Sequence, residues 1–173
     1  MAQRFGAEAF AGMTARLATL GRAEGIEFRF DSRTGNTRDS HRLIQLGKAR
    51  GGARGQDDVV SALFRLYFEN DGDITSRDAL VGAAAAAGLD PADARDWLDT
   101  GKGGAEVDRE VEEAYAQGIH GVPNFTINEK YQVDGAQDAQ VFLQYFAKIK
   151  AVEQPDPATN GSENPSCAPG GQC

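Results

Sequence analysis

The 173-residue sequence predicts an α/β protein that is mostly α-helical, in which several helices are followed by a β-hairpin and a last helix. Two observations carry this prediction. Up to about residue 117, apolar side chains recur every three or four positions, which is the spacing of one helix face. From Asn124 the period changes to two, which indicates strands, and a helical pattern returns near Asp138.

The amino-terminal part contains several predicted elements. Residues 7–23 carry one apolar stripe, which we expect to be buried, and Ile26–Phe30 then alternates as a short strand does. Asn36 or Thr37 is placed to cap the next helix. A strongly amphipathic helix follows the glycine-rich residues 51–55. We expect its apolar side chains to form core: Val59, Val60, Leu63, Phe64, Tyr67 and Phe68.

Start and stop signals delimit the next helices. Ser76 precedes a helix that ends near Gly88, although the sequence lacks a full capping box there. Asp90 directly precedes Pro91, which combines a good N-cap residue with proline at the first helical position. A longer helix then runs from about residue 105 to 117, where a glycine stops it.

The carboxy-terminal part is predicted to be a ββα unit. Residues 124–127 and 131–133 alternate in polarity, and Asn128–Lys130 between them can turn, which indicates a hairpin. The last helix starts at Asp138, and its aromatic face has to pack against a flat surface such as this hairpin. Residues 153–173 are rich in proline and glycine, so we expect a disordered tail.

The composition excludes several classes of partner. The formal charge is −8, from 18 basic and 26 acidic residues, and no basic stripe is present, so we expect no nucleic-acid partner. No apolar run is long enough to span a membrane. The amino terminus carries no apolar region typical of a secretory leader, so we expect a cytoplasmic protein.

The two cysteines lie in the predicted tail, where a disulfide between them cannot cross-link the folded part of the chain. Cys167 and Cys173 are redox candidates, but no positive charge or helix end stands near them, which favours two ordinary thiols. A zinc site needs about four ligands. His41 and His120 are far in sequence from each other and from both cysteines, so we predict no metal site, and we predict no cofactor.

A short proline-containing segment carries the clearest functional signal. Gly121, Val122 and Pro123 stand between a helix end and the first strand of the hairpin, where a proline without an N–H can sit at a strand's start. The residues alone leave open whether the peptide bond before this proline is trans or cis. His120 precedes this segment and is either a substrate-binding residue or a capping residue.

Two segments resemble one known family. Residues 118–127, read with Gly135–Asp138, resemble the close of a DsbA-type thioredoxin domain, and Asn36–Ile44 is similar to part of the helical insertion in the FrnE-like branch of that family. The resemblance spans residues 1 to about 150. It implies a partial thioredoxin fold, with a helical insertion over about 1–118 and a ββα unit over about 119–150.

The resemblance also implies a function. Relatives of this kind are thiol–disulfide oxidoreductases, in which the equivalent of Val122–Pro123 is a cis-proline loop that faces the redox motif and pairs with an extended substrate. The implied substrate-binding residues are His120, Gly121, Val122 and Pro123. The implied partner is a polypeptide or a small thiol.

The family pattern also requires an amino-terminal strand and a Cys-x-x-Cys motif, and these 173 residues contain neither. We therefore expect a chain that is amino-terminally incomplete and inactive or impaired as given. Exposed sheet edges favour self-association. Two alternatives stay open: a glutathione-dependent transferase or isomerase of the kappa-like branch, and a noncatalytic protein-interaction domain.

Overall fold

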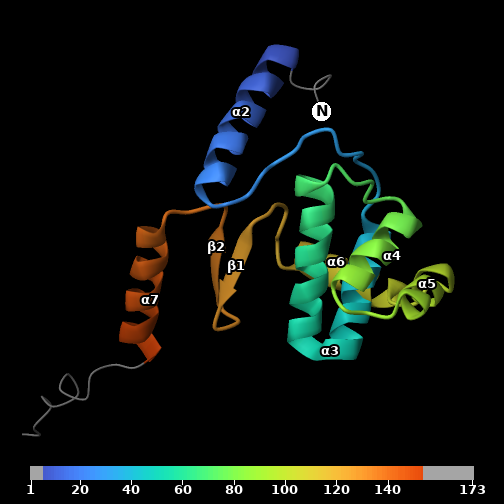
Figure 1. Ribbon diagram of the computed structural model, residues 1–173. Coiled ribbons are helices and arrows are strands. Elements are labelled where there is room, and N and C mark those ends of the chain that lie inside the picture. The colour runs from blue at the N-terminus through green and yellow to red at the C-terminus, as the bar shows by residue number, and fades with distance from the viewer. Residues whose placement is uncertain (1–5, 154–173) are drawn as a thin grey trace, which may run out of the picture. The chain divides into compact units, whose positions relative to one another are not determined.

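The computed structural model describes residues 6–153, and the chain divides into two compact units (Figure 1). The first unit extends to Ala116 and the second begins at Gln117. The predicted α/β, mostly helical fold class is confirmed: the described residues form helices and one two-stranded antiparallel sheet. None of the helices in this range is long and apolar enough to cross a membrane.

The first unit is helical throughout. Its elements are α2 (Ala7–Ala23), α3 (Arg38–Phe64), the π-helix η1 (Arg65–Glu69), α4 (Arg77–Ala86), α5 (Pro91–Asp99) and α6 (Gly104–Ala116). Two predicted caps are confirmed. The Ser76 hydroxyl accepts the Ala79 N–H at 3.4 Å, and the Asp90 carboxylate accepts the Ala92 N–H at 2.7 Å. At the start of α3, Asn36 rather than Thr37 supplies the side-chain acceptor, to the Arg38 N–H at 2.8 Å.

Helix α3 runs through the glycine-rich segment and is sharply kinked within it. Gly52 has φ 61° and ψ −147°, which divides α3 into two arms (Figure 1). The arms come close where both carry glycine, because a Cβ on Gly47 would lie 2.5 Å from the carbonyl oxygen of Gly55. Glycine therefore sets both the bend and the approach of the two arms.

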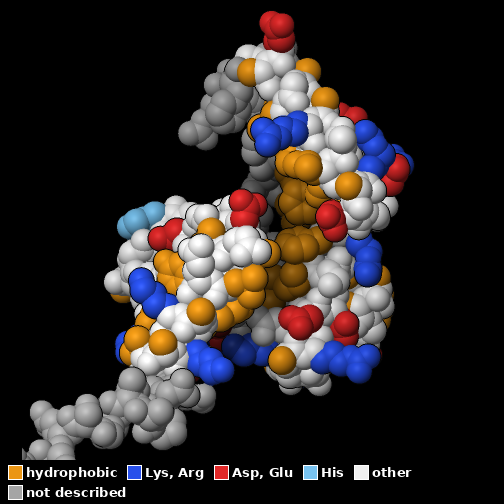
Figure 2. All heavy atoms as spheres, turned by 90° about the vertical axis from the view of Figure 1, so that its left-hand side faces the viewer, with side chains coloured by type: hydrophobic (Ala, Val, Ile, Leu, Met, Phe, Trp, Pro, Cys, Tyr) orange, Lys and Arg blue, Asp and Glu red, His pale blue; other side chains and the backbone are white. Residues whose placement is uncertain are grey.

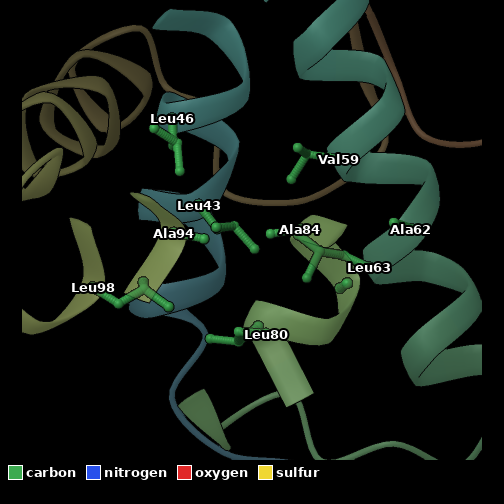
Figure 3. Packing of buried hydrophobic residues seen from close by; sticks show 10 residues of the cluster. Leu43, Leu46, Val59, Ala62, Leu63, Leu80, Ala84, Ala94 and Leu98 are labelled. Atoms are coloured by element: carbon green, nitrogen blue, oxygen red, sulfur yellow. The ribbon is translucent and has the colours of Figure 1, made fainter. Parts of the chain in front are cut away.

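The core of the first unit lies between the two arms of α3 and helices α4 and α5 (Figure 3). Small and large side chains alternate in it, which allows close packing. The buried members of this cluster are Leu43, Leu46, Val59, Ala62, Leu63, Leu80, Ala83, Ala84, Ala94 and Leu98.

A buried arginine ties α3 to the segment that joins α5 to α6. Arg42 is 2% exposed and donates to the carbonyl oxygens of Trp97 at 2.7 Å and Lys102 at 2.9 Å. It also pairs with Asp39 at 2.7 Å. Partial burial acts to raise the pKa of Asp39, but hydrogen bonds from Arg42 and Arg77 outweigh it and hold that pKa below its usual value.

Three expectations about the amino-terminal part are wrong. Ile26–Phe30 forms no strand, because its backbone pairs with the π-helix instead: the Arg29 N–H donates to the Phe68 carbonyl at 2.7 Å. The apolar stripe of α2 is largely exposed rather than buried. Of the core predicted along the second arm of α3 and η1, Val59 and Leu63 are buried, but Phe64 is 59% exposed and η1 contains no buried residue.

The second unit is the predicted ββα. Strands β1 (Asn124–Ile127) and β2 (Tyr131–Asp134) pair antiparallel in register, Phe125 opposite Val133, and helix α7 (Ala139–Glu153) follows. Three residues, 128–130, connect the strands: Asn128 and Glu129 have φ 50° and 57°, and the Lys130 N–H closes the turn by donating to the Ile127 carbonyl at 3.2 Å. The rings of Phe125 and Phe142 meet edge to face with centroids 5.0 Å apart, which confirms that α7 packs on the hairpin.

Candidate functional site

The four predicted substrate-binding residues lie together in one exposed loop. Helix α6 ends at Ala116, Gly118 turns the chain at φ 77°, and the loop then leads into β1. His120, Gly121, Val122 and Pro123 are all exposed, and Val122 is 91% exposed. The Val122–Pro123 peptide bond is cis. The loop thus presents an apolar side chain and a proline beside the start of a strand.

Backbone and side-chain hydrogen bonds fix this loop to the hairpin. The Gly135 N–H donates to the Pro123 carbonyl at 2.8 Å, and the Asn124 amide donates to the Asp134 carboxylate. At the same end of the hairpin, the Gln137 side chain donates to the Asp134 carbonyl at 2.8 Å. These bonds hold the carbonyl of the cis-proline in a fixed place at the end of the ladder.

Gly135 holds the proline loop in place, and the sequence carried it in the family resemblance without a role of its own. It has φ 78°, a conformation that glycine adopts at little cost, and this geometry aims its N–H at Pro123. A signal was available, because a glycine directly after an alternating strand indicates a special turn. The interpretation missed the role because the acceptor is twelve residues away.

The hairpin leaves backbone groups available for pairing. Strands β1 and β2 pair with each other, and within residues 6–153 neither has a second neighbouring strand. An unpaired strand edge offers N–H and C=O groups to any extended chain that lies alongside. The strand edge can hydrogen-bond to an extended backbone, and the loop can make one apolar contact with a side chain of the same partner.

Other candidate residues fall elsewhere. Cys167 and Cys173 lie outside the described residues. His41 is an exposed residue of α3 in the first unit, whereas His120 belongs to the loop of the second unit. Over residues 6–153 there is no cluster of three or more histidine, cysteine, aspartate or glutamate side chains arranged to hold a metal ion.

Comparisons with known proteins agree with this arrangement. The family described as DSBA-like thioredoxin domain matches residues 5–147. This chain belongs to the DsbA-like thioredoxin domain family. The two-stranded sheet and its helices are accordingly part of a DsbA-like, thioredoxin-type fold.

A solved relative points to the same family. The crystal structure of a probable DsbA oxidoreductase from Streptomyces coelicolor is similar, with 35% sequence identity and a TM-score of 0.70. The match covers 87% of this chain and 63% of the other, so the chain spans less than two thirds of that DsbA-like protein. No curated protein matches the sequence. Family and neighbour together place this chain among DsbA-like thioredoxin domains.

Proposed function

We propose that this chain is the polypeptide-binding part of a DsbA-like thiol–disulfide oxidoreductase. The observation that carries the proposal is the exposed loop of Gly121, Val122 and Pro123 at the start of a hairpin whose edge is unpaired. An extended polypeptide adds to such an edge through its main chain, while neighbouring side chains select what binds. The proposed partner is therefore an extended polypeptide segment.

Each loop residue has a distinct part in this binding. Pro123 has no backbone N–H. A partner that lies against it therefore leaves no donor of this residue unsatisfied. Val122 supplies an exposed apolar contact. The imidazole of His120 adds a hydrogen-bonding group to the same loop. The bond from Gly135 to the Pro123 carbonyl keeps these groups in place.

The thiol chemistry needs groups beyond this loop. In disulfide exchange a thiolate attacks one sulfur of the substrate disulfide, a mixed disulfide forms, and the other sulfur leaves as a thiolate. The sequence has no Cys-x-x-Cys motif to supply that pair. We propose that the attacking thiolate comes from outside these 173 residues, and that the chain given is inactive or impaired in exchange by itself.

A reductase assay tests the chemical half of the proposal. With insulin as substrate and dithiothreitol as reductant, the 173-residue chain is expected to give no rate above the reductant alone. The double variant Cys167→Ser/Cys173→Ser controls for the tail thiols, which are redox candidates. Full activity in both chains contradicts the proposal, whereas activity lost in the double variant assigns the chemistry to the tail.

A binding experiment tests the polypeptide half. In ¹H–¹⁵N spectra of the labelled chain, carboxymethylated insulin B chain is expected to shift amides in residues 120–126, and Val122→Asp to weaken binding several-fold. Val111→Asp is the matched control, because Val111 is an exposed valine on α6 in the other unit. Shifts produced by glutathione but not by the B chain overturn the polypeptide in favour of a small thiol.

Within the family we place the chain in the FrnE-like branch. The support is Asn36–Ile44, whose members have structural roles at the start of α3: Asn36 accepts the Arg38 N–H, and Arg42 bridges to the α5–α6 connection. A phylogeny of DsbA-like domains that groups the chain outside this branch contradicts the assignment.

A second candidate function is polypeptide binding with no thiol chemistry. The absence of a Cys-x-x-Cys motif from a sequence that keeps the loop and the open edge favours it. The intact mass of the native protein separates the two functions. A mass of 18.4 kDa supports the noncatalytic binder, and a larger mass that includes a Cys-x-x-Cys segment supports the oxidoreductase.

A further inference from the structure

The first unit contains a pocket of about 280 Å³ beside the π-helix, and the proposed function makes no use of it. We call it the Thr34 pocket. It lies between the two arms of α3, η1 and the loop before α3, and the residues of its wall that matter here are Thr34, His41, Ile44, Phe64, Tyr67 and Phe68. All of them belong to one compact unit.

The wall of the Thr34 pocket is largely aromatic. The rings of Tyr67 and Phe68 meet edge to face with centroids 4.9 Å apart, and those of Phe64 and Phe68 do so at 5.7 Å. Leu63, which is buried, belongs to the same lining. Ring edges and faces turned in several directions suit another aromatic ring, because edge-to-face contacts are favoured over stacked ones.

One end of the Thr34 pocket is polar. The hydroxyls of Thr34 and Tyr67 are 2.7 Å apart, and since their single hydrogen bond uses one proton, the second proton is available to a ligand. The imidazole of His41 stands exposed in the same lining. The Ser40 hydroxyl is already used, because it donates to the Thr37 carbonyl at 2.7 Å.

The π-helix explains why these side chains face one cavity. Its wide turn leaves carbonyls that the neighbouring loops satisfy: Ser32 donates to the Tyr67 carbonyl, the Arg29 N–H to Phe68, and the Gly72 N–H to Leu66. These bonds fix the backbone of η1, which carries Tyr67 and Phe68 of the pocket wall. π-Helical turns are rare and occur frequently at functional sites.

We propose that the Thr34 pocket binds a small aromatic molecule of roughly two fused rings that carries one hydroxyl group. A dry protein cavity of about 150 Å³ holds one benzene ring, so a cavity of this volume has room for a second ring. The aromatic wall contacts the rings, and the Thr34–Tyr67 hydroxyl pair binds the polar group. This inference does not depend on the proposed function, which concerns the other unit.

A larger neighbouring groove does not carry the same inference. It measures about 850 Å³ and lies between the exposed stripe of α2 and η1, with Met13, Leu17 and Phe28 in its lining. It shares part of its wall with the Thr34 pocket: Thr34, Phe64, Tyr67 and Phe68. Hydrophobic side chains, orange in Figure 2, gather below α2 at the top of that view. Nothing in the structure shows what covers this groove, so it serves as the competing site in the test.

The test uses 2-naphthol, which has two fused rings and one hydroxyl, with the full ¹⁵N-labelled chain. Saturable shifts are expected in the amides of His41 and Ile44, which line the Thr34 pocket and not the groove, and in those of Thr34 and Tyr67, which line both. Ile44→Trp fills the pocket and is expected to abolish them, while Val111→Trp, on exposed α6, leaves them unchanged. Shifts centred on Met13 and Leu17, or no saturable binding at all, overturn the proposal.

A second pair of variants tests the polar end without touching the core. Thr34→Val removes the exposed hydroxyl and is expected to weaken 2-naphthol binding about 2- to 10-fold, the range of one hydrogen bond. Thr19→Val is the control, since the Thr19 hydroxyl bonds to the Ala15 carbonyl within α2. Equal affinity of the Thr34 variant and the native chain contradicts the assigned role of the hydroxyl pair.

Discussion

The two units of this DsbA-like chain differ in what holds them together. In the first unit, two arms of one helix enclose a cluster of ten buried apolar side chains with α4 and α5. In the described part of the second unit, the buried apolar side chains are Val133 and Ile149. The first unit is therefore defined by its core, and the second by a turn, a short ladder and one helix.

This difference separates stability from binding. The second unit has a two-stranded sheet with an unpaired edge. An extended polypeptide can pair with such an edge through its main chain. The described residues of the first unit form no strand, so this unit offers no strand edge to such a partner. Each prediction below is directed at this contrast.

The largest effect is expected at Arg42 in the helical unit. Arg42→Ala removes a buried guanidinium, so the carbonyls of Trp97, Leu98 and Lys102 lose its hydrogen bonds and Asp39 keeps only its pairing with Arg77. We expect this to cost about 3–5 kcal/mol of unfolding free energy. Urea unfolding followed by circular dichroism measures the loss. Arg54→Ala is the control, because that side chain is 94% exposed, and a change within about 0.5 kcal/mol is expected there.

Two leucines give a matched comparison of the units. Leu43 is 0% exposed in the core cluster, so Leu43→Ala is expected to cost about 2–5 kcal/mol. Leu143 on α7 is 55% exposed, so Leu143→Ala is expected to cost less than about 1 kcal/mol. Urea midpoints for both variants decide the matter, and equal losses contradict the contrast between the units.

A glycine pair tests how the loop is held. Gly135→Ala forces a side chain into a positive-φ conformation and is expected to cost about 1–2 kcal/mol. Hydrogen exchange of the hairpin amides measures it, and faster exchange is expected there without a change in α3. Gly121→Ala is the control, because Gly121 lacks a positive φ and an added Cβ would meet nothing within 4 Å.

The smallest effect is expected from pH. The folded-state pKa of Asp39 lies below its usual value, so its contribution is present above the unfolded pKa of about 3.9 and is lost as the pH falls through the folded pKa. Between about pH 5 and 2, the free energy of unfolding of Asp39→Asn should therefore fall less than that of the native chain, by at most about 1 kcal/mol. Urea midpoints of both chains across this range measure it, and parallel curves contradict the assignment.

Local signals in the sequence predicted much of this fold. Asp90 before Pro91 starts α5, and Asn128 with Glu129 forms the hairpin turn. Both work within a few residues, through one side-chain bond or one backbone conformation, so no distant partner is needed. The proline at a strand's start marked the loop from His120 to Pro123 in the same way, while the predicted binding role of this loop came from the family resemblance.

The failures share a different cause. The alternation of Ile26–Phe30 is typical of a strand, yet a strand forms only beside a partner strand. Here the segment hydrogen-bonds to the π-helix instead. The apolar stripes of α2 and η1 were predicted to be core, but amphipathic spacing says that a face is apolar without saying what lies opposite. The pocket walls were missed for this reason.

The sequence by itself therefore determined most of the helices, the hairpin, their caps and turns, the place of the proline loop and the family to which the resemblance pointed. The tertiary structure alone decided the kink at Gly52, the burial of Arg42 among distant carbonyls, and which apolar faces became core or pocket. The physical reason is that caps and turns are satisfied by neighbours in the chain. Whether a side chain is buried depends on which residues pack against it, and these residues can be distant in sequence.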